Sequence, residues 1–525
     1  MQEEELKVTR IRKLYKSIHS ICRRLLDRRG RINIFMKDRY SSGKIALVAS
    51  LAAGMIMVAL LFIPPYKGVA DDGSLYRVLQ HTGLVYTETK PEDIYNNYFI
   101  KRYRIETTSL GNRKIKNSQD IFVKGAILID TLLTGDQYFD IRFLALLYYL
   151  LYIPAIYLLI KYACRWIYYF SEVVTVAALS VFIFADISYV SYFNSLYPEA
   201  LWSICSLYFL AAILRMNIRK CSYLSLFLVG VFGSLLCLSR KQCSVIGFVL
   251  AGFCIAAFFY HRSFKWKASC IFLSIFLSAA AMFAYYSMEE DFNLTSKYHA
   301  MTRGVLFEAP NPEAALREFG INPSFAILAK TSAYNPYPFV VVDNEQLKKE
   351  FYDQYKTKDV VIYYIKHPVL FLRMLDVAVK NMASLRRSYC GNYEKSAGMP
   401  KMAQGFFWSG WSNFKMRFAP GTVGYLLVLN FVAFLLNYYY RRSKSSLVEE
   451  RVNSLLTFPV MITLMGLSQA AIAIVKSGDA ELAQHTFLLG SSLDLLVFFI
   501  STQWITRLKI FRMEDEKVVK AERLS

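Results

Sequence analysis

Two adjacent acids follow the first long apolar run of the sequence and fit catalysis best by residue type. Asp71 and Asp72 stand directly before Gly73, in the segment Ala-Asp-Asp-Gly-Ser. Adjacent carboxylates at a membrane surface can act as a general base or bind a divalent cation. The alternative interpretation is a solvated Asp-Gly turn. The sequence leaves open which acid is the base and whether a metal is needed.

Three further polar segments lie between later apolar runs. Asn194 and its neighbours could bind a polyol or form an interfacial tyrosine belt. An Arg–Lys pair can hold an anionic group such as phosphate, although an ordinary short loop is the alternative. An acid within an apolar run marks a site or a buried structural pair, and a single His is a weak metal signal. The candidate substrate-binding residues are Asn194, Tyr197, Glu199, Arg240, Lys241, Gln242, Glu481, His485 and Asp494.

The composition limits the class of protein that can carry these residues. Of 525 residues, 55% are hydrophobic and 19% are charged, with a formal net charge of +22. Disordered chains are poor in aromatic residues, whereas this chain has 16%. Two classes remain, namely a basic nucleic-acid-binding protein and a multi-spanning membrane protein.

Apolar runs decide between these two classes. A helix needs about 20 mostly apolar residues to cross the hydrocarbon. The runs are 45–65, 141–161, 172–190, 199–214, 223–239, 243–260, 268–287, 421–439, 455–475 and 488–506. No nucleic-acid motif and no internal repeat is visible. The sequence therefore predicts an all-α polytopic membrane protein with about ten transmembrane helices and no nucleic-acid partner.

The distribution of Lys and Arg predicts the orientation in the bilayer. Segment 1–44 carries 13 Lys or Arg and 5 Asp or Glu, so we expect a cytoplasmic basic amphipathic segment on the inner leaflet. Both termini are then cytoplasmic in a multi-pass protein of the plasma membrane, and the candidate residues fall on the outer face. The expected parts are 1–44, spans 1–7 within 45–287 with an outer loop 66–140, an extracytoplasmic helical domain 288–420, spans 8–10 within 421–506, and a cytoplasmic tail 507–525.

The outer regions carry helix signals of their own. Residues 119–134 have the pattern of an amphipathic helix. Asn311-Pro312 is typical of a helix start and Gly320 of its end. Residues 344–387 indicate helices broken near His367-Pro368. The aromatic stretch 405–420 could be a lid, an acceptor groove or a structural interfacial patch.

Four segments together resemble a known family. They are Ala-Asp-Asp-Gly-Ser-Leu-Tyr-Arg (70–77), Tyr-Phe-Asn-Ser-Leu-Tyr-Pro-Glu (192–199), Ile-Lys-His-Pro (365–368) and Gly-Asp-Ala-Glu-Leu-Ala-Gln-His (478–485). Their order and outer placement resemble bacterial GT-C-type membrane glycosyltransferases, in particular WsfD-like hexose transferases of glycan biosynthesis. The resemblance covers most of the chain from about 45 to 506.

The resemblance implies a GT-C-like fold and an inverting hexosyl transfer. The donor would be a polyprenyl-phosphate-linked sugar, and the acceptor a cell-envelope glycan or a lipid-linked molecule. Asp71 matches the family's catalytic acid, whereas Asp72 and Ser74 replace the Asn and Asp that relatives carry. A lipid-linked glycan flippase or transporter, a glycan polymerase or ligase, and an envelope scaffold remain alternatives, although transporters usually show repeats and charges at the bilayer midplane.

Overall fold

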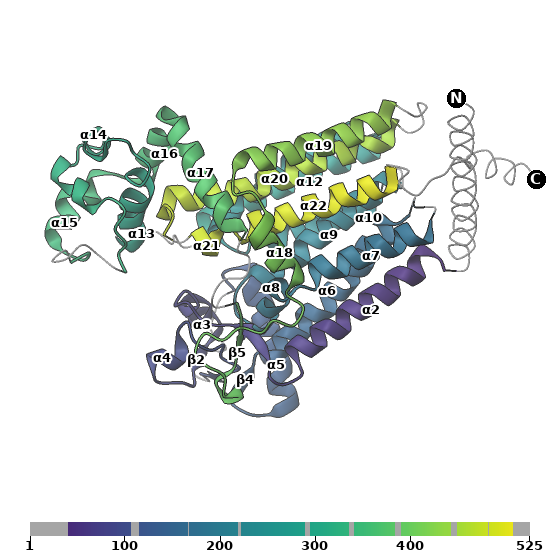
Figure 1. Cartoon of the computed structure of the whole chain (residues 1–525), viewed down its shortest axis with the longest axis horizontal. Helices are drawn as coiled ribbons and strands as arrows, with labels where there is room; N and C mark the ends of the chain where they lie inside the picture. The colour runs from purple at the N-terminus through teal and green to yellow at the C-terminus, as the bar shows by residue number, and fades with distance from the viewer. Residues whose placement is uncertain are drawn as a thin grey trace, which may run out of the picture.

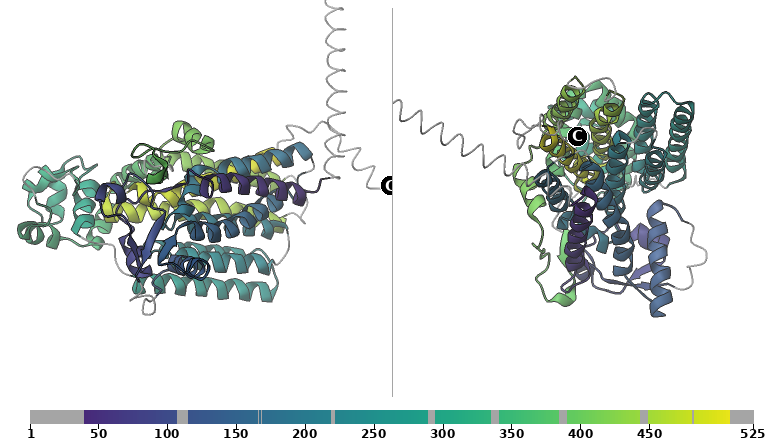
Figure 2. Two further views of the ribbon diagram at one scale, coloured as in Figure 1. Left: turned by 90° about the horizontal axis from the view of Figure 1, so that it is seen from below. Right: turned by 90° about the vertical axis from the view of Figure 1, so that its right-hand side faces the viewer.

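Long apolar helices form a bundle whose axes run in one general direction (Figure 1 and Figure 2). The computed structural model describes residues 40–106, 115–165, 167, 169–218, 222–288, 294–334, 341–383, 390–442, 449–480 and 482–507. Almost all of the segment 1–44 and of the tail 507–525 lies outside the described residues. The bundle helices are α2 (Ser42–Leu61), α6 (Arg142–Ala163), α7 (Phe170–Phe184), α9 (Glu199–Ile218), α10 (Tyr223–Cys237), α11 (Ser244–Phe258), α12 (Phe264–Ser287), α19 (Val423–Arg442), α20 (Glu449–Ser477) and α22 (Phe487–Arg507).

Each of the ten predicted runs coincides with one of these helices, but fewer qualify as spans. In the described part, seven helices are long and apolar enough to cross a membrane singly. Two bent pairs raise the number to nine: α7 with Ile187–Asn194 at 47°, and Gly410–Phe418 with Val423–Tyr438 at 112°. Helix α10 has 15 residues, fewer than the roughly 20 that a straight span needs. The chain is a multi-pass membrane protein with seven to nine candidate spans.

Helix burial separates the centre of the bundle from its lipid-facing rim. Of the apolar stretch Glu199–Met216 in α9, 94% is buried, against 33% for α12. Exposed Phe272, Phe283 and Tyr286 cover the outer face of α12. A helix keeps its backbone hydrogen bonds within itself, so such a rim can face hydrocarbon without unpaired backbone groups.

The connections divide between the two ends of the bundle. The described residues within 62–141 and 288–422 lie at one end, which we call the loop-bearing end (Figure 1). We call them the first and the second outer region, where outer means outside the helix bundle. The start of α2 and the ends of α6 and α22 lie at the other end (Figure 1). This alternation agrees with the predicted order of loops, although it does not assign either end to the cytoplasm.

Strands of the first outer region take part in two small antiparallel sheets, which the all-α prediction missed. Strands β2, β3 and β4 form one sheet, and β1 pairs with β5, which follows more than 300 residues later. Helix α5 confirms the predicted amphipathic helix and packs on α6. The elements are β1 (Lys67–Val69), α3 (Tyr76–Thr82), β2 (Leu84–Tyr86), α4 (Pro91–Ile94), β3 (Arg102–Ile105), α5 (Ser118–Thr134) and β4 (Tyr138–Asp140).

The second outer region is mainly helical, as predicted. Asn311 caps α14 by accepting a hydrogen bond from the Ala314 N–H at 3.0 Å, and Gly320 follows with φ of 71°. The helical pattern breaks at His367, between α16 and α17. The elements are α13 (Leu294–His299), η4 (Ala300–Val305), α14 (Pro312–Glu318), α15 (Glu345–Glu350), α16 (Thr357–Lys366), α17 (Pro368–Met382), β5 (Cys390–Tyr393) and α18 (Gly410–Phe418).

Residues 390–418, which we call the strap, connect the second outer region back to the first. Strand β5 pairs with β1, and Lys395 and Lys401 bind acids of α4. The Nζ–oxygen distances are 2.8 Å to Asp93 and 2.6 Å to Glu92. The strap therefore covers the segment that holds the adjacent acids.

Substitution of Gly478 by Ala tests the contact between the 478–485 segment and η4. Gly478 has φ of 57°, and an added Cβ would lie 2.3 Å from the carbonyl carbon of Arg303. We expect Gly478→Ala to lower the free energy of unfolding by about 2–4 kcal/mol, measured as a lower Tm in detergent. Gly252→Ala is the control, because no atom lies within 4 Å of that added Cβ. Equal Tm values for the two variants would contradict this contact.

Candidate functional site

The acidic pair lies in a turn that directly follows β1. Asp71 forms an isolated parallel bridge with Tyr95, and its carbonyl accepts the Asn96 N–H at 2.7 Å. Gly73 has φ of 92°, which suits glycine and closes the turn. The Asp71 carboxylate accepts the Gly73 N–H at 2.7 Å and a hydrogen bond from the Tyr86 hydroxyl. The turn itself and strand β2 thus fix the Asp71 carboxylate, while Tyr95 and Asn96 fix its backbone.

Burial gives Asp71 the character of a stronger base. Its exposed fraction is 1%, and the rings of Tyr86 and Tyr95 lie 6.2 Å apart beside it. Burial raises the pKa of the Asp71 carboxyl above its ordinary value, while the hydrogen bonds from Tyr86 and Gly73 oppose that rise and Asp72 adds to it. A carboxylate with a raised pKa accepts a proton more readily than a solvated one.

Asp72 is held by a tyrosine from the second polar segment. The Tyr197 hydroxyl donates to Asp72 Oδ1 at 2.7 Å and accepts the Asp72 N–H at 3.0 Å. Asn194, in the 3₁₀ turn η2 (Ser191–Asn194), donates from Nδ2 to the carbonyls of Leu61 and Lys67 at 3.1 and 2.9 Å. The structure therefore joins Asp72 to Tyr197, and it joins Asn194 to the strand that precedes the acidic turn.

Arg240 is connected to the acids indirectly, through Trp202 of α9. Its guanidinium lies 5.5 Å from the ring centroid of Trp202, whose Nε1–H donates to Ser239 Oγ at 2.8 Å. Trp202 stands one turn after Glu199, the buried first residue of α9. Tyr197 precedes that helix by two residues, so the acids and Arg240 flank the start of α9.

Lys241 has different neighbours from Arg240. It begins the 3₁₀ turn η3 (Lys241–Cys243), and its Nζ lies 5.2 Å from the ring of Tyr285 on α12. The carbonyl of buried Gln242 accepts from Gln469 Nε2 at 3.3 Å, towards α20. The predicted Arg–Lys phosphate pair therefore separates into two side chains with different neighbours.

The 478–485 segment is followed two residues later by Phe487, which packs on aromatic rings near the site. Buried His485 ends the short helix α21 (Leu482–His485). The ring centroid of Phe487 lies 5.1 Å from that of Tyr192 and 6.3 Å from that of Trp202. Asp479 instead pairs with Arg303, at 2.7 Å from its Nη2. The predicted Glu481 lies outside the described residues.

Asp494 lies in the bundle within a buried ion pair. Its Oδ1 is 2.8 Å from Lys415 Nζ of the strap, and its Oδ2 accepts the Tyr189 hydroxyl at 2.5 Å. Both carboxylate oxygens are occupied by protein groups. This geometry favours the buried structural pair over the predicted substrate contact.

The described residues around Asp71 and Asp72 do not form a set of ligands for a divalent cation. Among the described residues, no group of three or more His, Cys, Asp or Glu side chains is arranged to hold a metal ion. The Asp71 oxygens already accept from Tyr86 and Gly73, and Asp72 Oδ1 accepts from Tyr197 and Ser74. The donor set therefore does not fit a metal centre built on the acidic pair.

Sequence reasoning missed Tyr86 and Trp202, the partners of Asp71 and Arg240. Tyr86 lies on a three-residue strand too short to give an alternating pattern, and Trp202 lies inside an apolar run. The one available signal for these two residues is their side-chain chemistry. Tyr and Trp carry a polar atom on an apolar ring, so a buried one usually has a hydrogen-bond partner.

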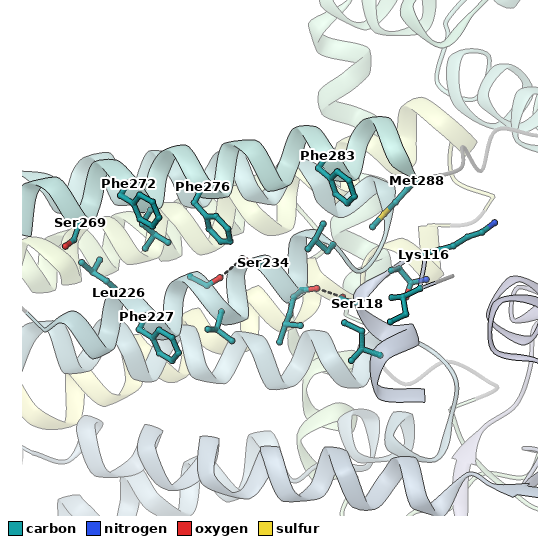
Figure 3. A pocket seen from close by; sticks show the side chains of 18 of the residues that line it. Lys116, Ser118, Leu226, Phe227, Ser234, Ser269, Phe272, Phe276, Phe283 and Met288 are labelled. Atoms are coloured by element: carbon teal, nitrogen blue, oxygen red, sulfur yellow. Dashed lines mark hydrogen bonds between the residues drawn. The ribbon is translucent and has the colours of Figure 1, made fainter. Parts of the chain in front are cut away.

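An apolar groove of about 690 Å³ runs between α10 and α12 and ends at the start of α5 (Figure 3). Phe227, Phe272 and Phe276 line its length, and Lys116 lies at its end (Figure 3). There the Ser118 N–H donates to the Leu238 carbonyl at 2.9 Å. Leu238 precedes Arg240 by two residues, so the groove leads to the loop that carries Arg240.

Comparison with known proteins gives a family and one distant structural likeness. The family model described as YfdI N-terminal transmembrane domain matches residues 33–522. The chain is similar to the archaeal oligosaccharyltransferase AglB from Archaeoglobus fulgidus, solved with an inhibitory peptide and a dolichol-phosphate, at 11% identity and a TM-score of 0.35. The match covers 91% of this chain and 54% of AglB, so the chain spans about half of that protein's length. A search of curated proteins gives no match.

Removal of Lys415 tests whether Asp494 has a structural role. Because Lys415→Met leaves a buried carboxylate without its cation, we expect a loss of about 3–5 kcal/mol in unfolding free energy. The double variant Lys415→Met/Asp494→Leu should recover most of that loss, since it removes both charges. Thermal unfolding in detergent measures both effects, and a double variant no more stable than Lys415→Met would argue against the pair as a structural element.

Proposed function

The chain belongs to the YfdI N-terminal transmembrane domain family, and from that membership and the geometry of its loop-bearing end we propose that it is a membrane glycosyltransferase. The proposed reaction is an inverting transfer of a hexose from a polyprenyl-phosphate-linked donor to a cell-envelope glycan or a lipid-linked acceptor. The four sequence segments that resemble GT-C-type and WsfD-like transferases support this choice of reaction.

One observation carries the proposal, namely that Tyr197 connects the acids to the helix that positions Arg240. The Tyr197 hydroxyl contacts Asp72 at 2.7 Å, and Arg240 lies over Trp202 in the first turns of the helix that follows Tyr197. A base and a cation near one helix start are the two groups that glycosyl transfer from a phosphate requires.

The chemistry follows from these two charges. Asp71 or Asp72 accepts the proton of an acceptor hydroxyl as its oxygen attacks the anomeric carbon. The bond between that carbon and the phosphate oxygen breaks, and the electron pair leaves with the lipid phosphate. Arg240 stabilises the charge that develops on the leaving phosphate, since its planar guanidinium suits phosphate oxygens. One displacement inverts the anomeric configuration.

The groove between α10 and α12 supports a lipid-linked donor. Its apolar length suits an isoprenoid chain, and its end lies beside Lys116 and two residues from Arg240. A chain in this groove would carry its phosphate to the loop-bearing end. The lipid would enter sideways from the bilayer, because α12 lies at the rim of the bundle.

The proposed orientation puts the loop-bearing end outside the cytoplasm. Basic residues such as Lys161, Arg215 and Lys265 lie at the other end of their helices, as the positive-inside rule expects for the cytoplasmic face. In this orientation the protein lies in the plasma membrane with both termini in the cytoplasm. A polyprenyl-linked sugar presented on the outer leaflet reaches the acids, whereas a cytosolic nucleotide sugar does not.

Removal of either acid tests the proposed base. We expect Asp71→Asn or Asp72→Asn to abolish transfer. For the residue that takes the proton, the rate of transfer should fall at least about a hundredfold. The assay uses purified protein and a radiolabelled polyprenyl-phosphate hexose. Asp353→Asn is the matched control, because Asp353 is exposed in the second outer region. Full activity in both single variants, with normal membrane insertion, would exclude these acids as the base.

The pH profile of Tyr86→Phe tests the role of Asp71 separately. The Tyr86 hydroxyl stabilises the Asp71 carboxylate and lowers its pKa against the rise caused by burial. Without this hydroxyl the pKa of Asp71 rises further, so a larger fraction is protonated at a given pH. We expect the acidic limb of the rate profile to shift to higher pH. An unshifted limb would assign the base to Asp72.

A further inference from the structure

A second cavity, of about 680 Å³, lies between the bundle and the second outer region. Its walls come from α11, α12 and α20 on one side and from α16 and α17 on the other. Three cations line it, namely Lys241, Lys358 and Lys476, and none of its lining residues is acidic. We call it the lysine cavity.

Apolar side chains form the rest of the lysine cavity. Val361, Ile365 and Phe371 contribute from the outer region, and Ile472 and Val475 from α20. A cavity that combines lysine side chains with apolar walls suits a ligand with a phosphate at one end and hydrocarbon at the other. A soluble anion such as free phosphate leaves these walls in contact with water.

The position of the lysine cavity matches the depth of lipid headgroups. Lys476 stands one residue before the end of α20, and Tyr285 stands two residues before the end of α12. Tyr285 and Tyr286 are 53% and 77% exposed, as tyrosines in an interfacial belt are. Ile365 on α16 is 73% exposed, so apolar surface continues from the rim of the bundle onto the outer region.

Helix α12 separates the lysine cavity from the groove that leads to Arg240. Phe272, Phe276 and Phe283 line the groove, whereas Tyr285 lines the cavity. Positions 283 and 285 point to different sides of a helix, because successive residues advance by about 100°. Lys241 lines the cavity and Lys116 lines the groove, so the two compartments have different cations.

We propose that the lysine cavity binds an anionic phospholipid of the bilayer. Its phosphate contacts Lys241, Lys358 and Lys476, and its acyl chains lie against α16, α17 and α20. The lipid bridges the second outer region to the bundle. This site is distinct from the donor groove and does not depend on the proposed glycosyl transfer.

Lipid retention by the full-length protein tests this site. We propose to reconstitute it in nanodiscs of phosphatidylcholine and phosphatidylglycerol, re-extract it in detergent, and count bound lipids by native mass spectrometry. The wild type should retain phosphatidylglycerol in preference to phosphatidylcholine. Lys358→Gln/Lys476→Gln should bind it about thirtyfold more weakly, because each lysine near the surface contributes about a fivefold step. Lys358→Arg/Lys476→Arg should retain it, as both cations remain.

Matched controls decide between this site and general surface charge. Lys349→Gln/Lys380→Gln removes the same charge from exposed positions of the second outer region outside the cavity and should leave retention unchanged. Equal loss in this control, or no loss in Lys358→Gln/Lys476→Gln, would overturn the proposal. Preferential retention of an isoprenyl monophosphate that displaces phosphatidylglycerol would also overturn it and assign the cavity to a substrate carrier. If the double Gln variant does not fold, Lys358→Gln alone provides the same comparison, because its side chain is exposed.

Discussion

The ion pair between Lys415 and Asp494 is the interaction on which the candidate site depends. Both side chains are almost fully buried, and neither charge is tolerable there without the other. The pair fixes α18 against α22, while the Ser412 N–H donates to Asp186 at 3.0 Å from the same helix. Because α18 is fixed, the earlier part of the strap, which contains β5, runs back over the first outer region. Its strand β5 then supports β1, and β1 ends directly before the acidic turn.

Much of the fold could be predicted because lipid imposes simple demands on the sequence. Each apolar run, such as 268–287, coincides with a helix, since only helices and closed barrels satisfy the backbone in hydrocarbon. The number of full spans was harder to predict, because hydropathy does not reveal a bend such as the 112° break before α19. The cap at Asn311 and the break at His367 were predictable from local chemistry alone.

The candidate site was predictable only in part, because its contacts join distant segments. The grouping of Asp72 with Tyr197 followed from the expectation that both lie on one face of the membrane. The separation of Arg240 from Lys241 could not be predicted in this way. The directions of adjacent side chains depend on the backbone of the 3₁₀ turn that begins at Lys241. The small sheets were missed because strands of three or four residues carry no measurable period.

The pairing of β1 with β5 also sets the order in which the protein matures. Val69 and Cys390 are partners although roughly 320 residues separate them. At a synthesis rate of about 5–20 residues per second, the ribosome needs tens of seconds to supply β5 after β1 has emerged. The acidic turn waits during that time without its supporting strand, and α2 to α12 enter the bilayer before the strap exists. A nascent chain thus lacks the strand that supports its acidic turn until Cys390–Tyr393 has been synthesised.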